Sequence, residues 1–272
     1  MADTLSPRGV FDTHAHYTDA RFAAEFDGGA DAAVSECFAR GMAGIINVGT
    51  NIENSRASVR MAAGYPLMYA AVGIHPSDIG MYGDFDSEMA ALAEMLGSRR
   101  ENKIVALGEI GLDHHWQPYD SALQEKYLDA QLSLARELDL PVIIHDREAH
   151  GDCFEAVLRH PGVRGVFHSY SGSAEMALEL CRRGFYISFS GTVTFKNARH
   201  VRSVVEEIPR ERLLVETDCP YLAPEPFRGR LNYSAYAAYT AAVIDDVLGL
   251  EGGSTADITR RNAMTLFGIA GE

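Results

Sequence analysis

The amino-acid sequence predicts a single (β/α)8 barrel, the fold also called a TIM barrel. Eight short apolar segments with the character of buried strands alternate with segments in which apolar residues have helical spacing. The length of 272 residues, with 47% hydrophobic and 23% charged residues, suits one barrel domain with a large core. Imidazole and carboxylate side chains recur where the strand-like segments end, and parallel strands bring such ends to one face.

The strand-like segments are short and nearly continuous in hydrophobicity. Val142-Ile143-Ile144 is an example, and it is followed directly by His145. Strands buried on both faces have this pattern, because helices cover them on one side and the barrel interior on the other. We expect strands at 9–14, 44–49, 67–75, 104–109, 141–145, 164–168, 185–190 and 213–218.

The intervening segments have apolar residues at three- and four-residue steps, which predicts amphipathic helices. The clearest is 121–138, and glycines such as Gly64 and Gly97 follow several of the others, as at helix ends. We expect helices at 31–40, 55–63, 87–97, 121–138, 153–159, 174–183, 200–207 and 235–248. A tail helix at 254–267 would cover one end of the barrel, and without a repeat or linker we expect one domain over 1–272.

Charge and composition exclude several classes of protein. The formal net charge of −14 argues against broad, non-specific adhesion to a polyanion, although bound cations would change the local field. No apolar run approaches the roughly 20 residues that a membrane span needs, and no signal peptide is recognisable. We therefore expect a cytoplasmic protein that does not enter a membrane. The four cysteines form no C-x-x-C pair and are expected to be small buried residues.

Six potential metal ligands fall at or just after the ends of predicted strands: His14, His16, Glu109, His145, His168 and Asp218. His14 and His16 lie two residues apart and can present two imidazoles to one cation. That pair alone is equally compatible with two hydrogen-bonded loop histidines. The whole set is not, because it repeats the same placement in five strands.

Barrel closure sorts these ligands into two groups. The eighth strand lies beside the first, so Asp218 should join His14 and His16, whereas His145 and His168 follow neighbouring strands on the other side. Glu109 ends the fourth strand, and its carboxylate could bridge both groups. Two divalent cations about 3.5–4 Å apart can activate a water and clamp the oxygens of a phosphoryl displacement.

The chain resembles the TatD family of metal-dependent deoxyribonucleases over nearly its whole length. The blocks that carry the resemblance are Asp12-Thr13-His14-Ala15-His16, Val72-Gly73-Ile74-His75-Pro76, Gly108-Glu109-Ile110-Gly111-Leu112-Asp113, Pro141-Val142-Ile143-Ile144-His145-Asp146-Arg147, Phe167-His168-Ser169-Tyr170-Ser171-Gly172, Glu216-Thr217-Asp218-Cys219-Pro220-Tyr221-Leu222-Ala223-Pro224, Phe227-Arg228-Gly229-Arg230 and Asn262-Ala263. Departures are few: this chain has Ser169-Tyr170 where relatives often have Cys-Phe, and Ser234 where they often have Pro.

This resemblance implies a phosphodiesterase that uses two divalent ions (Mg, Mn or Zn). It further implies a 3′–5′ exonuclease acting on single-stranded DNA ends. His14, His16, Glu109 and Asp218 match one metal site, and Glu109, His145 and His168 match the other.

Other residues have candidate catalytic or binding roles. Asp218 could also act as a base toward the attacking water, and His75 could contact the scissile phosphate, although a hydrogen-bonded core histidine is an equal alternative. Arg147 and Arg228 could bind phosphates, or could form surface salt bridges. Tyr170 could stack on a base, or could be a packing residue. We thus expect Asp218, Glu109 and His75 to be catalytic, and His75, Arg147, Arg228 and Tyr170 to bind substrate.

Two other functions compete with a nuclease. An amidohydrolase or phosphotriesterase-like enzyme acting on a small molecule also uses H-x-H in a barrel, but many such enzymes bridge their metals with a carboxylated lysine. None of Lys103, Lys126 and Lys196 is placed to do so. A non-catalytic scaffold is disfavoured because purely structural metal sites are usually closed by protein. The chain is long enough to act alone, and we expect a monomer.

Overall fold

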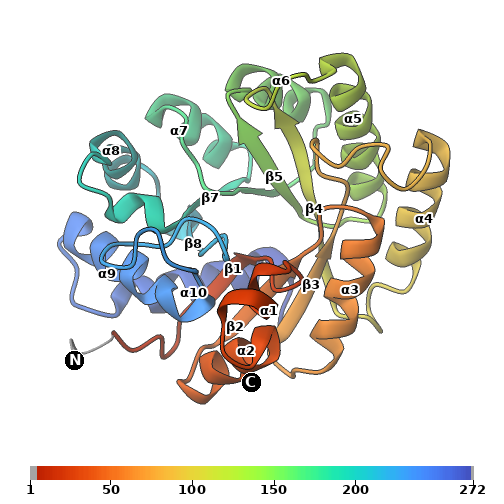
Figure 1. Ribbon diagram of the computed structural model, residues 1–272. Helices are drawn as coiled ribbons and strands as arrows, with labels where there is room; N and C mark the ends of the chain where they lie inside the picture. Colours follow the sequence, from red (N-terminus) through yellow and green to blue (C-terminus); the bar gives the residue numbers. More distant parts are fainter. Residues whose placement is uncertain (1–4, 271–272) are drawn as a thin grey trace.

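Eight parallel strands form one sheet that curls into a nearly closed barrel, which confirms the predicted fold (Figure 1). The computed structural model describes residues 5–270. Each strand pairs with its neighbours in sequence order. The strands are β1 (Phe11–Ala15), β2 (Gly44–Val48), β3 (Met68–Val72), β4 (Ile104–Asp113), β5 (Val142–Arg147), β6 (Gly165–Phe167), β7 (Tyr186–Phe189) and β8 (Leu213–Val215).

The fourth strand, β4, is the one that departs most from expectation, because it continues to Asp113 and not only to Glu109. Its extra residues pair with β5, where Gly111 lies opposite His145 and Asp113 opposite Arg147. Gly111 has φ +153°, and a β-carbon there would overlap the carbonyl oxygen of His145. Glycine at this position therefore lets the two strands stay paired up to the mouth of the barrel.

Helices surround the strands, as Figure 1 shows for α3 to α9. They are α1 (Arg21–Glu25), α2 (Gly29–Ala39), α3 (Ile52–Ala63), α4 (Phe85–Gly97), α5 (Ser121–Glu137), α6 (His150–Arg159), α7 (Ala174–Arg182), α8 (Arg199–Glu207), α9 (Ala237–Leu248) and α10 (Ser254–Phe267), with 3-10 turns η1 (Gly191–Thr194), η2 (Arg210–Arg212) and η3 (Ser234–Tyr236). The nine predicted helices are present, and the short α1 was not predicted. Several begin earlier than the apolar spacing indicates, because side chains such as Asn51 and Asp84 cap the first turn.

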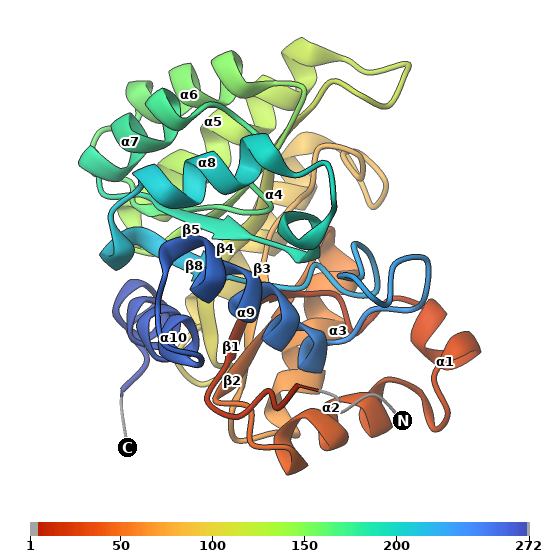
Figure 2. The ribbon, with the colours of Figure 1, turned by 90° about the vertical axis from the view of Figure 1, so that its left-hand side faces the viewer.

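Helix α10 covers the amino-terminal end of the barrel, as the tail helix was expected to do. Leu266 and Phe267 belong to one buried cluster with strand residues that include Phe11, Ile143 and Leu214. Figure 2 shows α10 beside β1 and β8, the strands that it contacts. The amino end is thus a packed apolar core, which leaves the carboxyl end for a polar site.

The seam between β1 and β8 is held largely by groups other than a regular strand ladder. The Asp12 carboxylate accepts hydrogen bonds from the backbone N–H groups of His14 (3.2 Å) and Thr217 (3.0 Å). The backbone N–H of Asp218 donates to the carbonyl of His14 at 2.9 Å. These bonds fix the position of Asp218 relative to His14.

The single domain expected over 1–272 stays a prediction, and its ends, residues 1–4 and 271–272, lie outside the described residues. Within residues 5–270, no helix combines the length and the apolar character needed to cross a membrane.

Candidate metal centre and its cavity

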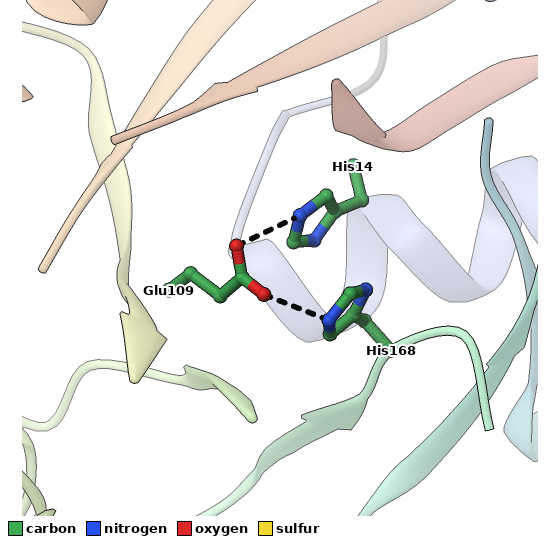
Figure 3. Close-up of side chains that lie close together, drawn as sticks. All are labelled: His14, Glu109 and His168. Atoms are coloured by element: carbon green, nitrogen blue, oxygen red, sulfur yellow. Dashed lines mark ion pairs between the residues drawn. The ribbon is translucent and has the colours of Figure 1, made fainter. Parts of the chain in front are cut away.

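The structure brings all six predicted ligands together at the carboxyl end of the barrel. They surround the Glu109 carboxylate: His14, His16, His145, His168 and Asp218. Figure 3 shows Glu109 between His14 and His168, with one oxygen toward each ring. Oε2 lies 3.4 Å from Nε2 of His14, and Oε1 lies 2.9 Å from Nε2 of His168. The two oxygens of Glu109 therefore face two different groups of ligands.

The first group consists of His14, His16 and Asp218. Nε2 of His14 and Nε2 of His16 are 3.0 Å apart, and each points to the same carboxylate oxygens. Oδ1 of Asp218 lies 3.7 Å from Nε2 of His14 and 3.3 Å from Nε2 of His16. Asp218 has φ +57°, a backbone conformation that is uncommon for residues other than glycine. Such conformations are concentrated at functional sites, and here the residue lies where polar groups converge.

The second group consists of His145 and His168, which face the other oxygen of Glu109. Nδ1 of His145 lies 2.8 Å from Oε1 of Glu109 and 3.3 Å from Nε2 of His168. The ring of His168 also stacks on that of His14, with centroids 4.0 Å apart. The division of ligands around Glu109 is the one expected from barrel closure.

The hydrogen bonds of the rings suit cation binding. Nδ1 of His16 faces the carbonyl of Val48 (3.0 Å), and Nε2 of His145 faces the Asp113 carboxylate (3.1 Å). These partners only accept, so those nitrogens carry a hydrogen. Loss of the proton from the other nitrogen of each ring would leave a lone pair that faces the cluster and could bind a cation. Several lone pairs and two carboxylates converging in a buried place form a donor set that fits a divalent cation.

Burial and charge shift the pKa values of these groups in opposite directions. Burial opposes ionisation of Glu109, but His168, His75 and His14 outweigh it and hold the pKa of Glu109 well below its usual range. Burial also opposes protonation of His16, whose pKa is nevertheless raised to about 9 by Asp218 and Glu109. Strong perturbation by specific partners in a cavity is typical of functional sites.

Two carboxylates outside the cluster orient its histidines. Asp113 accepts from Nε2 of His145 at 3.1 Å. Oε1 of Glu216 lies 3.3 Å from Nδ1 of His168 and accepts from the backbone N–H of Ser169 at 2.8 Å. The structure places the Glu216 carboxylate against His168. Oε2 of Glu216 is buried without a hydrogen-bond partner.

His75 lies at the edge of the cluster, with Nε2 3.6 Å from Oε1 of Glu109. The backbone N–H of Ser77 donates to Nδ1 of His75 at 3.0 Å, so the neutral ring carries its hydrogen on Nε2. Burial and the neighbouring His145 lower the pKa of His75 to about 3, which keeps the ring neutral. His75 thus presents an N–H donor to the site.

A cavity of about 850 Å³ opens above the cluster. It is lined by His75, Arg147 and Tyr170 among other residues. The Tyr170 hydroxyl donates to the carbonyl of Ser173 at 2.8 Å, so its ring is the part that can contact a ligand. Arg228 does not line the cavity, and its guanidinium carbon lies 4.4 Å from the centroid of the Phe195 ring.

Several polar residues of this cavity were not predicted from the sequence. Thr50, Asn54, Ser77 and Asp78 follow β2 and β3, and all of them line it. A polar signal was present, because each lies within a few residues after a predicted strand. These side chains are not metal ligands by type and spacing, so they were not singled out.

The fold and the cluster define a class: a (β/α)8 barrel with a candidate metal centre in a cavity at the carboxyl ends of its strands. Comparison with known proteins gives the family. The family model described as "TatD related DNase" matches residues 11–268. The chain therefore belongs to the TatD family.

Relatives agree with this assignment. The Bacillus subtilis protein named uncharacterized metal-dependent hydrolase YabD is 38% identical over 263 residues, which cover 96% of this chain and 99% of YabD. The similarly named YjjV of Escherichia coli is 34% identical and covers 95% of this chain and 97% of its own length. The crystal structure of YjjV, described as a TatD homolog, matches with a TM-score of 0.87 at 32% identity, covering 97% of this chain and 100% of that one.

A more distant structure marks the limit of such comparisons. A mutant of a PTE-like lactonase from Deinococcus radiodurans matches with a TM-score of 0.62 at 17% identity, covering 95% of each chain. This similarity shows the barrel fold alone.

Proposed function

We propose that this TatD-family chain is a metal-dependent phosphodiesterase that hydrolyses DNA. The observation that carries the proposal is the Glu109 carboxylate, which lies between two sets of ligands on the floor of a cavity. One set is His14, His16 and Asp218, and the other is His145 and His168. We infer that each set, together with Glu109, holds one divalent ion (Mg, Mn or Zn). Two ions so held would polarise the phosphoryl group and lower the pKa of water.

The residues of the chain have distinct roles in the proposed hydrolysis. Asp218 accepts the proton of the attacking water, whose oxygen forms the new bond to phosphorus. The bond from phosphorus to the leaving sugar oxygen breaks, and that oxygen takes up a proton from solvent, while Asp218 returns the proton that it accepted to solvent. His75 donates a hydrogen bond from Nε2 to a phosphoryl oxygen, because its Nδ1 is already an acceptor.

The proposed substrate is the 3′ end of single-stranded DNA, processed in the 3′–5′ direction. Arg147 can hold a phosphate bidentately, and it stacks on the 62%-exposed Trp116, whose ring is thus available to a base. The ring of Tyr170 also lines the cavity. We do not assign Arg228 to the substrate, since it lies outside the cavity. A monomer suffices, because one chain supplies all the ligands.

A hydrolase that acts on a small amide, ester or phosphotriester is the competing function. Its common bridging group, a carboxylated lysine, has no counterpart among the residues that line the cavity. Lys103 donates to backbone carbonyls, including that of Tyr65 at 2.6 Å, and Lys126 lies over the Phe85 ring. Glu109 occupies the bridging position instead.

Incubation of a short single-stranded oligodeoxynucleotide with the protein and Mg, Mn or Zn, with and without EDTA, tests the proposal. We expect stepwise shortening that stops on chelation and is lost in Glu109→Gln. An intact oligonucleotide with every metal, together with turnover of a lactone, amide or triester, would reject the nuclease in favour of its competitor.

A further inference from the structure

The cavity above the candidate ligands has walls of different charge. One wall, here called the acidic wall, follows β1, β2 and β3 and consists of Asp19, Thr50, Asn54, Ser77 and Asp78. All five side chains are polar, and two of them are carboxylates. None of them is a candidate metal ligand, so the charges of the two carboxylates are not committed to a metal ion.

The facing wall, here called the arginine wall, consists of Trp116 after β4 and Arg147 at the end of β5. The guanidinium carbon of Arg147 lies 5.4 Å from the centroid of the Trp116 ring. Arg147 is the only Lys or Arg among the described residues that line the cavity. A phosphate beside the metal centre can therefore pair with a cationic side chain of the cavity only at Arg147.

The carboxylates of the acidic wall have neutral partners. Asp78 accepts from the Thr50 hydroxyl at 2.8 Å and from the Asn51 amide at 2.7 Å. Asp19 accepts from a backbone N–H at 2.8 Å and from a tyrosine hydroxyl at 2.6 Å. Neither forms an ion pair with any residue in the described part of the chain. Their negative charges are thus directed at whatever occupies the cavity.

The charged residues around the acidic wall do not neutralise its negative charge. The other carboxylates of the cavity that are not candidate ligands, Asp113 and Asp146, each pair with a histidine. Arg21, two residues after Asp19, has its guanidinium carbon over the Tyr221 ring, 5.4 Å from the centroid. Nε of Arg21 is already paired with Glu25 at 3.2 Å.

The acidic wall is also rich in uncharged hydrogen-bonding groups. Oδ1 of Asn54 is buried and has no partner in the protein, so it can accept from a ligand N–H or O–H. The hydroxyl of Ser77 lines the same surface. A wall of carboxylate, amide and hydroxyl groups suits a neutral group that bears hydroxyls and repels a second phosphate.

On the basis of the phosphodiesterase activity proposed above, we propose that the acidic wall selects a strand end with a free hydroxyl. In this arrangement the terminal nucleoside lies against Asp78 and Asn54, and its free hydroxyl can donate to them. The rest of the strand, with its phosphates, leaves along the arginine wall. The bond that is cleaved is then the terminal one, and an end that bears a phosphate is a poor substrate.

Electrostatics sets the size of the effect. A terminal phosphate monoester has a charge of about −1.5 to −2 at pH 7, whereas a terminal hydroxyl is neutral and can donate to a carboxylate. Against two unpaired carboxylates in a partly enclosed cavity, we expect the phosphate to lower kcat/KM by roughly tenfold or more.

The test compares one oligodeoxynucleotide with hydroxyls at both ends to the same strand phosphorylated at the 5′ end, the 3′ end or both. Initial rates give kcat/KM for each strand with the metal that supports cleavage. We expect phosphate at the processed end to be strongly inhibitory and phosphate at the other end to have little effect. Equal rates for all four strands would overturn the selection of a hydroxyl end while leaving the phosphodiesterase intact.

Asp78→Asn tests whether the acidic wall is responsible. Asparagine keeps an oxygen that can accept from Thr50 and Asn51, but it removes the charge. We expect the ratio of kcat/KM for hydroxyl and phosphate ends to fall by about threefold or more. Asp257→Asn is the matched control, because it removes the same charge on α10, at the opposite end of the barrel.

Two further results complete the test. If Asp78→Asn does not fold, Asp19→Asn makes the same charge change on the same wall and should lower the same ratio. If the ratio of kcat/KM for hydroxyl and phosphate ends is unchanged in the folded variants, the acidic wall does not distinguish the two kinds of strand end. If no strand is cleaved with Mg, Mn or Zn, the chain lacks the phosphodiesterase activity on which the inference depends.

Discussion

The two ends of the barrel are built by the same strands and have opposite chemistry. In β5, Ile143 packs in the apolar cluster under α10, and two residues later His145 faces Glu109. In β6, Val166 belongs to that apolar cluster, and His168 follows the strand at the mouth. A few residues along one strand therefore separate a position that stabilises the fold from one that we assign to function.

This division has an energetic reason. The amino end buries aliphatic and aromatic side chains, which contributes roughly 25 cal/mol for each Å² of apolar surface removed from water. The carboxyl end buries charged and polar groups, which costs free energy unless each is paired or bound to a cation. Substitutions at the two ends should therefore change different measured quantities.

The largest effect is expected for Glu109→Gln at the carboxyl end. The amide keeps the size of the side chain but removes the charge that faces both groups of histidines. We expect kcat/KM to fall by about a hundredfold or more, with fewer ions bound per chain. Activity assays and metal analysis by mass spectrometry measure both. A variant that still binds two ions would show that Glu109 does not bridge them.

At the amino end, Leu266→Ala should separate stability from activity. Leu266 is 3% exposed and packs in the cluster that closes this end of the barrel. Removing its side chain should lower the free energy of unfolding by about 2–5 kcal/mol. Denaturant unfolding measures that loss, and kcat of the folded variant should equal that of the parent. A drop in kcat at unchanged metal content would mean that the two ends are coupled.

A smaller effect is expected for Glu216→Gln. Glu216 is not a candidate ligand itself but contacts one, His168. Glutamine can still accept from the Ser169 backbone, but it holds the hydrogen of His168 less strongly than a carboxylate does. We expect metal affinity to fall by about tenfold and the stability of the metal-free protein to change little. Calorimetric titration with Zn or Mn measures the first quantity and thermal unfolding the second. Unchanged affinity would make Glu216 a packing residue.

The sequence predicted the barrel and the convergence of its polar residues for one physical reason. Strands such as Val142-Ile143-Ile144 are buried on both faces, so their hydrophobicity is continuous, and a histidine directly after them is conspicuous. The same pattern hides the continuation of β4 beyond Glu109, because Gly111 permits pairing there through backbone geometry and not through hydrophobicity.

Roles set by contacts that form only in the folded chain could not be predicted. Glu216 turns toward His168, 48 residues away, and not toward an arginine in the nearby loop. The proton of His75 is placed by the backbone of Ser77, which only a folded loop reveals. The acidic wall was not predicted because neither Asp78, in the loop after β3, nor Asn54, in the first turn of α3, belongs to a motif that stands out in the sequence.

The smallest effect is expected for Arg147→Lys, a change at the rim of the cavity. This variant tests whether substrate binding at the carboxyl end involves the rim as well as the metal centre. Lysine keeps the charge but loses the planar fork that binds a phosphate with two hydrogen bonds and stacks on Trp116. We expect KM to rise by several-fold to about tenfold with kcat nearly unchanged, because the change affects binding before the chemical step.

Arg228→Lys is the matched control for Arg147→Lys. Arg228 also stacks on an aromatic ring, that of Phe195, but it lies outside the cavity. Steady-state kinetics of Arg228→Lys should therefore show a smaller rise in KM than that of Arg147→Lys. A larger rise for Arg228 would place the phosphate path beyond the cavity, over the loop that follows β8, and the arginine wall would have to be reassigned.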